Sequence, residues 1–259
     1  MKNKILNYID SMPPLPNSLI EINKALSDPE NGFDTLVKVI NSDPILTTMV
    51  LNLINSAIFN LKREINNINQ AIALLGVQEV ARVSLSLIIK DFFEFNLSPY
   101  NMNEEKFKEI NAININLAKQ ISKNGYNQLE EKLITTSYFI HIGKLLTSKV
   151  ILENNLEQIF KQKINQNPIE EIEKELLGLS SLKTTVLILE YFNLNNISEI
   201  IKESIEIDQK DFESDLPYLI HLITYYCDNQ INLPNENSKK YCKHFIEDND
   251  LNEKILSII

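Results

Sequence analysis

Glycine is scarce in this sequence, with five residues in a chain of 259. A chain that is poor in glycine and rich in leucine and isoleucine favours helices over β architectures, which need glycine for their turns. Cysteine is scarcer still, since Cys227 and Cys242 are the only two. Two thiols in a chain of this length do not predict a disulfide scaffold, so a reducing cytosol is the expected compartment.

Basic residues are outnumbered by acidic ones. The chain has 25 Lys and Arg and 35 Asp and Glu, so its formal net charge is −10. Phosphate backbones and anionic membranes are bound by clustered Lys and Arg, so we expect neither a nucleic acid nor a membrane as partner. No apolar run approaches the ~18 residues of a membrane span. The longest, "VSLSLII", lies between Arg82 and Lys90. The opening "MKNKILNYID" does not fit a secretion signal, and we expect a cytoplasmic protein.

The first structured segment is predicted to follow a proline-rich stretch. Pro13, Pro14 and Pro16 each fix φ and disfavour helix in the residue before them, so this stretch should be extended. The spacing from Ser18 to Glu21 fits a capping box, which predicts a helix that starts at Ser18. Its apolar face should consist of Leu19, Ile22, Ala25 and Leu26.

The segment "SDPILTTMVLNLINSAIF" predicts a second prominent helix. Asp43 is a good N-cap, and Pro44 suits the first helical position because no backbone donor is lost there. The body of this helix is apolar nearly all round, which predicts a place in the middle of a bundle. Asn55 and Ser56 end it, and we expect them to cap the helix or bond a neighbouring loop, with a recognition role as the alternative.

The best candidate for a boundary between two lobes of the chain lies near Pro99. We predict an N-terminal helical lobe over residues 1–99, a second helical lobe over 100–230 and a C-terminal helical tail over 231–259. Asn103 should cap a helix whose apolar face contains Phe107, Ile110, Leu117 and Ile121. The next helix should run from about Gln128 to Val150 and contain "YFIHIGKLL". No strand is predicted, so the expected fold class is all-α.

Five stretches, in this order, resemble the HDOD family, the HD-related output domain of bacterial signalling proteins. They are "MPPLPNSLIEI", "SDPILTTMVLNLINSAIF", "INQAIALLGVQEVARVSL", "IGKLL" and, more weakly, "LIHLITYY". The resemblance covers about Met12 to Thr224. It implies an all-helical protein in which an N-terminal helical lobe accompanies a lobe with the fold of the HD metal-dependent phosphohydrolases. It also implies a role in signal transduction without hydrolase activity.

The ligand positions of an HD-type metal site are the most informative part of the resemblance. Such a hydrolase holds its metal with a His, a His-Asp doublet and a distant Asp, and the metal activates water. This chain has no His before His141, its doublet reads Ile140-His141, and the distant position is Thr224. Isoleucine and threonine cannot replace the lost ligands, so we expect no metal, no cofactor and no catalytic residue. Ile140, His141, Lys144 and Thr224 would line a degenerate pocket.

Two residues of this pocket leave alternatives open. His141 could be a lone ligand or a proton-transfer group, but we favour a core or pocket histidine that hydrogen-bonds to backbone, because one His does not make a metal site. Lys144 could meet a phosphate, or its stem could pack while its ammonium reaches water.

The function expected from these observations is a non-catalytic HDOD output module that binds another signalling protein. The partner surface should lie on the N-terminal lobe or its junction with the second lobe. One alternative is a sensor that uses the vacated pocket for a nucleotide, for example a cyclic dinucleotide. The other is a residual metal-dependent phosphohydrolase. Ligand binding without turnover would favour the sensor, and metal-dependent turnover would favour the hydrolase.

Overall fold

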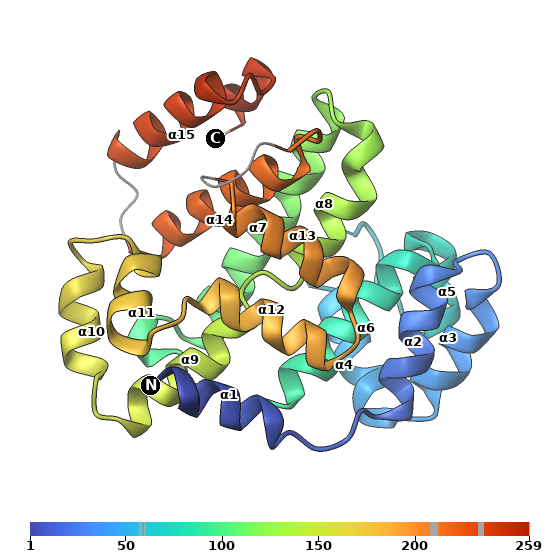
Figure 1. The fold of residues 1–259 in the computed structure, drawn as a ribbon. Helices are drawn as coiled ribbons and strands as arrows, with labels where there is room; N and C mark the ends of the chain where they lie inside the picture. Colours follow the sequence, from blue (N-terminus) through green and yellow to red (C-terminus); the bar gives the residue numbers. More distant parts are fainter. Residues whose placement is uncertain (57–58, 60, 208–211, 233–235, 259) are drawn as a thin grey trace. The chain divides into compact units, whose positions relative to one another are not determined.

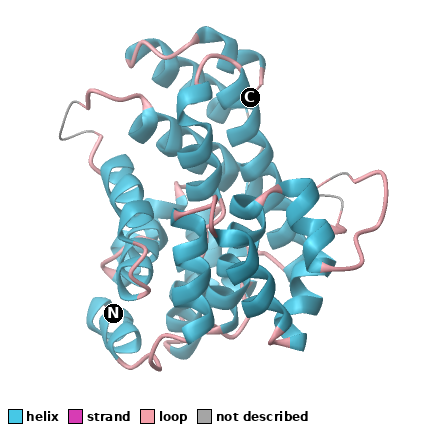
Figure 2. Ribbon diagram, turned by 90° about the vertical axis from the view of Figure 1, so that its right-hand side faces the viewer, coloured by secondary structure: helices cyan, strands magenta, loops and turns pink. Residues whose placement is uncertain are grey.

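The computed structural model of the protein describes residues 1–56, 59, 61–207, 212–232 and 236–258, and among these it describes the side chains of all but 229–232, 236–240 and 256. Every regular element within these ranges is an α-helix or a 3-10 helix, as Figure 2 shows, so the all-α prediction is confirmed. In the same ranges, no helix combines the length and the apolar character that crossing a bilayer requires.

Contacts within the chain group it into two compact units. Residues 12–93 form one unit, and residues 1–11 together with 94–259 form the other. We refer to them as the small unit and the large unit. The division predicted at residues 1–99, 100–230 and 231–259 stays a prediction.

Five helices lie in the described part of the small unit (Figure 1). These are α2 (Asn17–Ser27), α3 (Gly32–Asn41), α4 (Pro44–Ile54), α5 (Ile68–Leu75) and α6 (Val77–Asp91). Helix α2 packs against α3 and α6, and α4 packs against α3, α5 and α6. The predicted apolar face of α2 is confirmed, because Leu19, Ile22, Ala25 and Leu26 are all buried.

The start of α2 differs from the sequence prediction. The helix begins at Asn17, and no side chain caps it. The carbonyl oxygen of Pro16 instead accepts the first backbone hydrogen bond, from the N–H of Leu19 at 3.1 Å. Pro16 has an extended backbone and occupies the N-cap position, which places Ser18 inside the first turn. The prediction that Ser18 caps this helix is therefore wrong, because Ser18 lies within the helix and not at its N-cap.

Helix α4 begins as its sequence predicts, but it is not packed on all sides as its sequence predicts. The Asp43 carboxylate accepts the N–H groups of Ile45 and Leu46, at 2.9 and 3.0 Å, and Pro44 occupies the first turn. The expectation that this helix is buried all round is wrong. Val50 is fully buried, whereas the side chain of Ile45 is 72% exposed. Three neighbouring helices cover one face of α4 and leave the other open.

The end of α4 is tied to the chain that follows it. Asn55 donates its side-chain N–H to the carbonyl of Ile65 and accepts the N–H of Ile65, both at 2.8 Å. The hydroxyl of Ser56 donates to the Leu53 carbonyl at 2.6 Å. Asn55 thus fixes the loop between α4 and α5 at its two ends.

The large unit contains the remaining described elements. Its helices are α1 (Lys2–Asp10), η1 (Ser98–Tyr100), α7 (Glu104–Lys123), η2 (Asn127–Leu129), α8 (Glu130–Ser137), α9 (Gly143–Glu153), α10 (Glu157–Ile164), α11 (Ile169–Leu177), α12 (Ser181–Tyr191), α13 (Asn195–Ile205), α14 (Leu216–Asn232), α15 (Glu236–Asp248) and η3 (Glu253–Ser257). Helix α12 packs against α9 and α13, and α14 packs against α7, α8 and α13.

Helix α7 is the best-predicted element of the large unit. The side chain of Asn103 accepts the N–H of Lys106 at 2.8 Å and so caps it. All four predicted face residues are buried: Phe107, Ile110, Leu117 and Ile121. A regular apolar stripe and a good N-cap were sufficient here.

Candidate functional site

The stretch "YFIHIGKLL" runs from the end of α8 into the first turn of α9, in the large unit. A single helix over about Gln128 to Val150 was predicted, but α8 ends at Ser137 and α9 begins at Gly143. The intervening backbone makes short-range bonds, such as those from Ile142 N–H to the Phe139 carbonyl and from Lys144 N–H to the His141 carbonyl, both at 3.1 Å. The prediction of one continuous helix is therefore wrong.

The close approach of α12 explains this break. Thr185 of α12 accepts the N–H of Gly143 at 2.9 Å and donates its hydroxyl to the Ile140 carbonyl at 3.0 Å. A Cβ atom at Gly143 would lie only 1.9 Å from the backbone oxygen of Ser181. Only glycine lets the two helices come this close, and the side chains that follow it are thereby fixed against α12.

Lys144, in the first turn of α9, is buried with 2% of its surface exposed. Its Nζ atom lies 3.1 Å from Oδ1 of Asp228 on α14, donates to Oδ2 of the same carboxylate at 3.3 Å and donates to the Ser181 hydroxyl at 3.2 Å. The Tyr100 ring centroid is 5.2 Å from Nζ. The expectation that this ammonium reaches water is wrong, because protein groups surround it.

A second carboxylate lies in the same cluster. Buried Glu173 of α11 accepts the Tyr100 hydroxyl and the Ser181 N–H, each at 2.6 Å, and the Tyr100 hydroxyl also lies 2.7 Å from that of Thr147. Burial raises the pKa of Glu173, and the charge of Lys144 opposes that effect. Burial would lower the pKa of Lys144, but the charges of Asp228 and Glu173 outweigh it and raise that pKa. Lys144 is therefore a cation at neutral pH.

His141 is buried beside this cluster. Its Nδ1 atom lies 3.8 Å from Oδ1 of Asp228, and its Nε2 atom has no hydrogen-bond partner among the residues that the structure describes. Nε2 thus does not make the backbone hydrogen bond that was predicted for this side chain. Burial, followed by the charge of Lys144, lowers the pKa of His141 well below its usual value, so the ring is neutral at pH 7.

The other two predicted pocket residues contribute no ligand. Ile140 is buried, and its carbonyl bonds Thr185. The hydroxyl of Thr224, within α14, donates to the Ile220 carbonyl at 2.8 Å. The carboxylate that approaches His141 belongs to Asp228, one helical turn beyond Thr224. The sequence interpretation missed this residue although it stands in the same apolar helix pattern.

A buried polar side chain also occurs on α7. Asn114 is fully buried on the apolar stripe between Ile110 and Leu117. Its side-chain N–H lies 3.4 Å from the Ser137 carbonyl, and its oxygen accepts the thiol of Cys227 at 3.0 Å. An Asn in a line of apolar residues is a pattern that could have identified this position.

These residues do not fit an HD-type metal. Such a site needs about three or four convergent ligands. His141 and Asp228 supply two, and the Lys144 ammonium is paired with the same carboxylate. Within the described ranges, no three His, Cys, Asp or Glu side chains gather as metal ligands would.

Asp43, Pro44, Asn55 and Ser56, the other predicted residues of interest, belong to the small unit. Their observed contacts are those of the N-cap and the loop described above. They are not part of the His141 cluster, all of whose members belong to the large unit.

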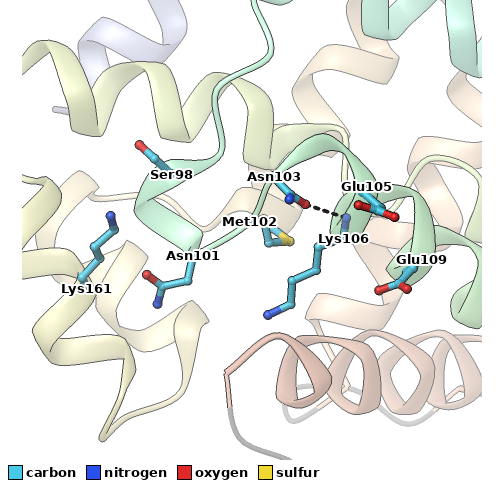
Figure 3. A pocket seen from close by; sticks show the side chains of 8 residues that line it. All are labelled: Ser98, Asn101, Met102, Asn103, Glu105, Lys106, Glu109 and Lys161. Atoms are coloured by element: carbon cyan, nitrogen blue, oxygen red, sulfur yellow. Dashed lines mark hydrogen bonds between the residues drawn. The ribbon is translucent and has the colours of Figure 1, made fainter.

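The large unit also contains an open cavity of about 550 Å³ (Figure 3). Eight residues line it: Ser98, Asn101, Met102, Asn103, Glu105, Lys106, Glu109 and Lys161. Lys161 pairs with Glu157 at 2.7 Å, and the Asn103 side chain is used as the cap of α7. Charges of both signs surround this cavity, and its ionisable side chains are not buried, so it points to no single class of ligand.

Known proteins resemble this chain in sequence and in fold. A protein of Treponema pallidum (strain Nichols), described as uncharacterized, is 31% identical over 83 residues; the match covers 32% of this chain and 16% of that protein. The chain thus spans a small part of this relative's length.

Crystal structures of other proteins have a similar fold. A protein of Shewanella amazonensis SB2B, provisionally named a phosphohydrolase, superposes with a TM-score of 0.69 at 17% identity, over 95% of this chain and 88% of its own. An HDOD domain protein of unknown function from Geobacter sulfurreducens gives 0.67 at 15% identity, over 99% and 91%. A virulence factor from Campylobacter jejuni subsp. jejuni gives 0.53 at 20% identity, over 99% and 96%.

At these identities, the structural likeness establishes the fold alone, which is the predicted HD-like helical fold. The family model for the HDOD domain matches residues 12–206, most of the chain. The fifth motif, "LIHLITYY", lies beyond residue 206, and its resemblance stays a prediction. The resemblance of the other four motifs is confirmed, and the chain belongs to the HDOD domain family.

Proposed function

We propose that this chain is a non-catalytic, cytoplasmic HDOD module that acts in bacterial signal transduction by binding another protein. The observation that carries the proposal is the pairing of Lys144 with Asp228 beside His141. A lysine ammonium takes the charge-neutralising role that a metal ion has in an HD hydrolase.

The neighbouring groups leave little room for metal chemistry. The Asp228 carboxylate beside His141 already neutralises Lys144, and both oxygens of Glu173 accept protein hydrogen bonds. A divalent cation that approached Asp228 would meet the Lys144 ammonium at close range and be repelled. Without the metal, nothing at His141 supplies the activated water that phosphoester hydrolysis needs.

The same contacts argue against the nucleotide sensor. A phosphate would need an unpaired cation, whereas Lys144 is buried and already bonded to Asp228 and Ser181. Entry of a phosphate would have to break an established buried pair, which is costly. A protein that binds at the surface does not need to break this buried pair.

Two assays test this proposal. Hydrolysis of bis(p-nitrophenyl) phosphate with Mn²⁺ or Mg²⁺ should proceed no faster with the wild-type chain than with His141→Ala. Affinity capture from an extract of the source bacterium, read by mass spectrometry, should enrich a signalling protein. Metal-dependent turnover that Asp228→Asn abolishes would overturn the proposal in favour of a hydrolase. Stoichiometric binding of a cyclic dinucleotide that Lys144→Met abolishes would overturn it in favour of a sensor.

A further inference from the structure

Helix α4 presents an apolar face that the small unit does not cover. Ile45 is the most exposed of the large hydrophobic side chains described, and Met49, one turn later, is half-buried. Leu87 and Ile88 of α6 are also half-buried. Single exposed apolar residues are common on proteins, but here several adjoin one another on two packed helices, which is typical of a binding surface.

These side chains line a groove of about 480 Å³ in the small unit. Its apolar lining comes from α4 and from the end of α6: Ile45, Leu46, Met49, Leu87, Ile88 and Phe92. Pro13 and Pro16, of the extended proline-rich stretch, line it as well. A concave apolar surface between two helices is suited to a third helix, whose side chains pack between those of the other two.

Charge restricts what could occupy this groove. Asp43 and Asp91 line it, both are exposed, and no Lys or Arg is among its lining residues. Oδ1 of Asp43 accepts both hydrogen bonds of the α4 cap, so the cap does not use Oδ2. The chain as a whole has a formal charge of −10. A matching occupant carries Lys or Arg beside its apolar face, because complementary charges favour association.

We propose that this groove is the docking site for an amphipathic helix of a partner protein, with an apolar face and flanking Lys or Arg residues. The inference rests on the proposed function, which it deepens by naming the surface and the chemistry of the partner. It also agrees with the expectation, from the sequence, that the partner surface lies in the N-terminal part of the chain.

A synthetic peptide provides the probe. A fluorescein-labelled Leu/Lys helix of about 14 residues, roughly four turns, presents leucines on one face and lysines on the other. A matched peptide replaces every Lys with Glu. In fluorescence anisotropy titrations with the full chain, the Lys peptide should bind at least about tenfold more tightly than the Glu peptide.

Matched variants locate the binding surface. Ile45→Asp should weaken binding of the Lys peptide about tenfold or more, because interface energy concentrates in a few residues. Leu74→Asp should leave it unchanged, since Leu74 is 61% exposed on α5 and does not line the groove. Asp91→Lys should weaken it and reduce its salt dependence, whereas Glu30→Lys, an exposed charge reversal outside the groove, should have little effect. Circular dichroism verifies that each variant is folded.

Three outcomes would overturn the inference. One is equal binding of the peptide to the wild-type chain, Ile45→Asp and Leu74→Asp. The second is equal weakening by Asp91→Lys and Glu30→Lys, which would indicate attraction by net charge alone. The third is a wild-type dimer in sedimentation that Ile45→Asp dissociates, because a second copy of the chain would then occupy the groove.

The two proposals can fail separately. If Ile45→Asp still captures the partner that the wild-type chain captures, the groove inference fails and the proposed function stands. If the wild-type chain hydrolyses phosphoesters with metal, the proposed function fails whatever the peptide titrations give.

Discussion

Replacing Lys144 with methionine should destabilise the fold strongly, because it removes the cation from a buried cluster that contains two carboxylates. Nζ of Lys144 lies 3.1 Å from Oδ1 of Asp228, and Glu173 is buried nearby. Removing one partner of a buried ion pair costs about 3–5 kcal/mol, since the other charge is left uncompensated. The side chain of Asp228 is 19% exposed, and water offsets part of this loss. We therefore expect a loss of about 3 kcal/mol in the free energy of unfolding.

Two further variants separate charge from packing. Methionine keeps most of the lysine stem, so little of the loss should come from a cavity. Adding Asp228→Asn to Lys144→Met removes the orphaned charge and should recover about 1–2 kcal/mol. Lys108→Met is the surface control: the Lys108 side chain is 57% exposed and pairs with Glu104 within α7. This control should lie within about 0.5 kcal/mol of the wild-type chain.

Urea unfolding followed by circular dichroism measures these differences. The reasoning is refuted if Lys144→Met loses no more stability than Lys108→Met. It is equally refuted if Asp228→Asn adds its own full loss to that of Lys144→Met, because the two residues would then be independent.

Three other perturbations have defined outcomes. Burial lowers the pKa of His141, so below about pH 6.5 the unfolded chain binds a proton that the folded chain does not. Urea titrations should show the wild-type chain losing stability relative to His141→Gln as pH falls, by at most about 1.4 kcal/mol per pH unit; parallel curves would contradict this. Gly143→Ala forces a Cβ against the Ser181 backbone and should cost about 3 kcal/mol. Gly178→Ala, at a left-handed helix end, should cost less, about 1–2 kcal/mol. If the Gly143→Ala and Gly178→Ala variants melt at similar temperatures, the contact between Gly143 and α12 is not as close as described. Asn55→Ala leaves the Ile65 backbone groups unpaired and should lower the free energy of unfolding in urea by about 1–3 kcal/mol. A change near zero would show that the Asn55 side chain does not stabilise the fold.

Local features of the sequence predicted much of the fold. Asp43 and Asn103 cap their helices because the side chain, the turn and the following residues are all within a few positions of one another. The apolar stripe of α7 repeats regularly enough to define its buried face. The four motifs that lie within residues 12–206 identified the family correctly.

The cluster around Lys144 could not be predicted in the same way. Lys144 and Asp228 are 84 positions apart, and their pairing depends on the tertiary arrangement of the helices that contain them. Alignment to the family motif pointed to Thr224, one turn before the residue that makes the contact. The burial of Glu173 could have been predicted, because this residue lies on the apolar face of α11 between Ile172 and Leu177.

Two further differences have tertiary causes. Periodicity alone extends a helix through Gly143, and only the approach of Ser181 and Thr185 from α12 reveals why it breaks there. The apolar composition of α4 predicted buried surface, and Leu46, Val50 and Ile54 are buried. It could not tell which apolar residues of the helix its neighbours leave uncovered, and Ile45 is one of them.

The metal content of the protein decides whether the residues around His141 form a metal site. Untagged protein, equilibrated with Mn²⁺ by dialysis and passed through a desalting column, should hold fewer than one ion per chain by elemental analysis, because His141 and Asp228 do not complete a site. One or two ions per chain that are retained by the wild-type protein and lost in His141→Ala would show that these residues do form a metal site.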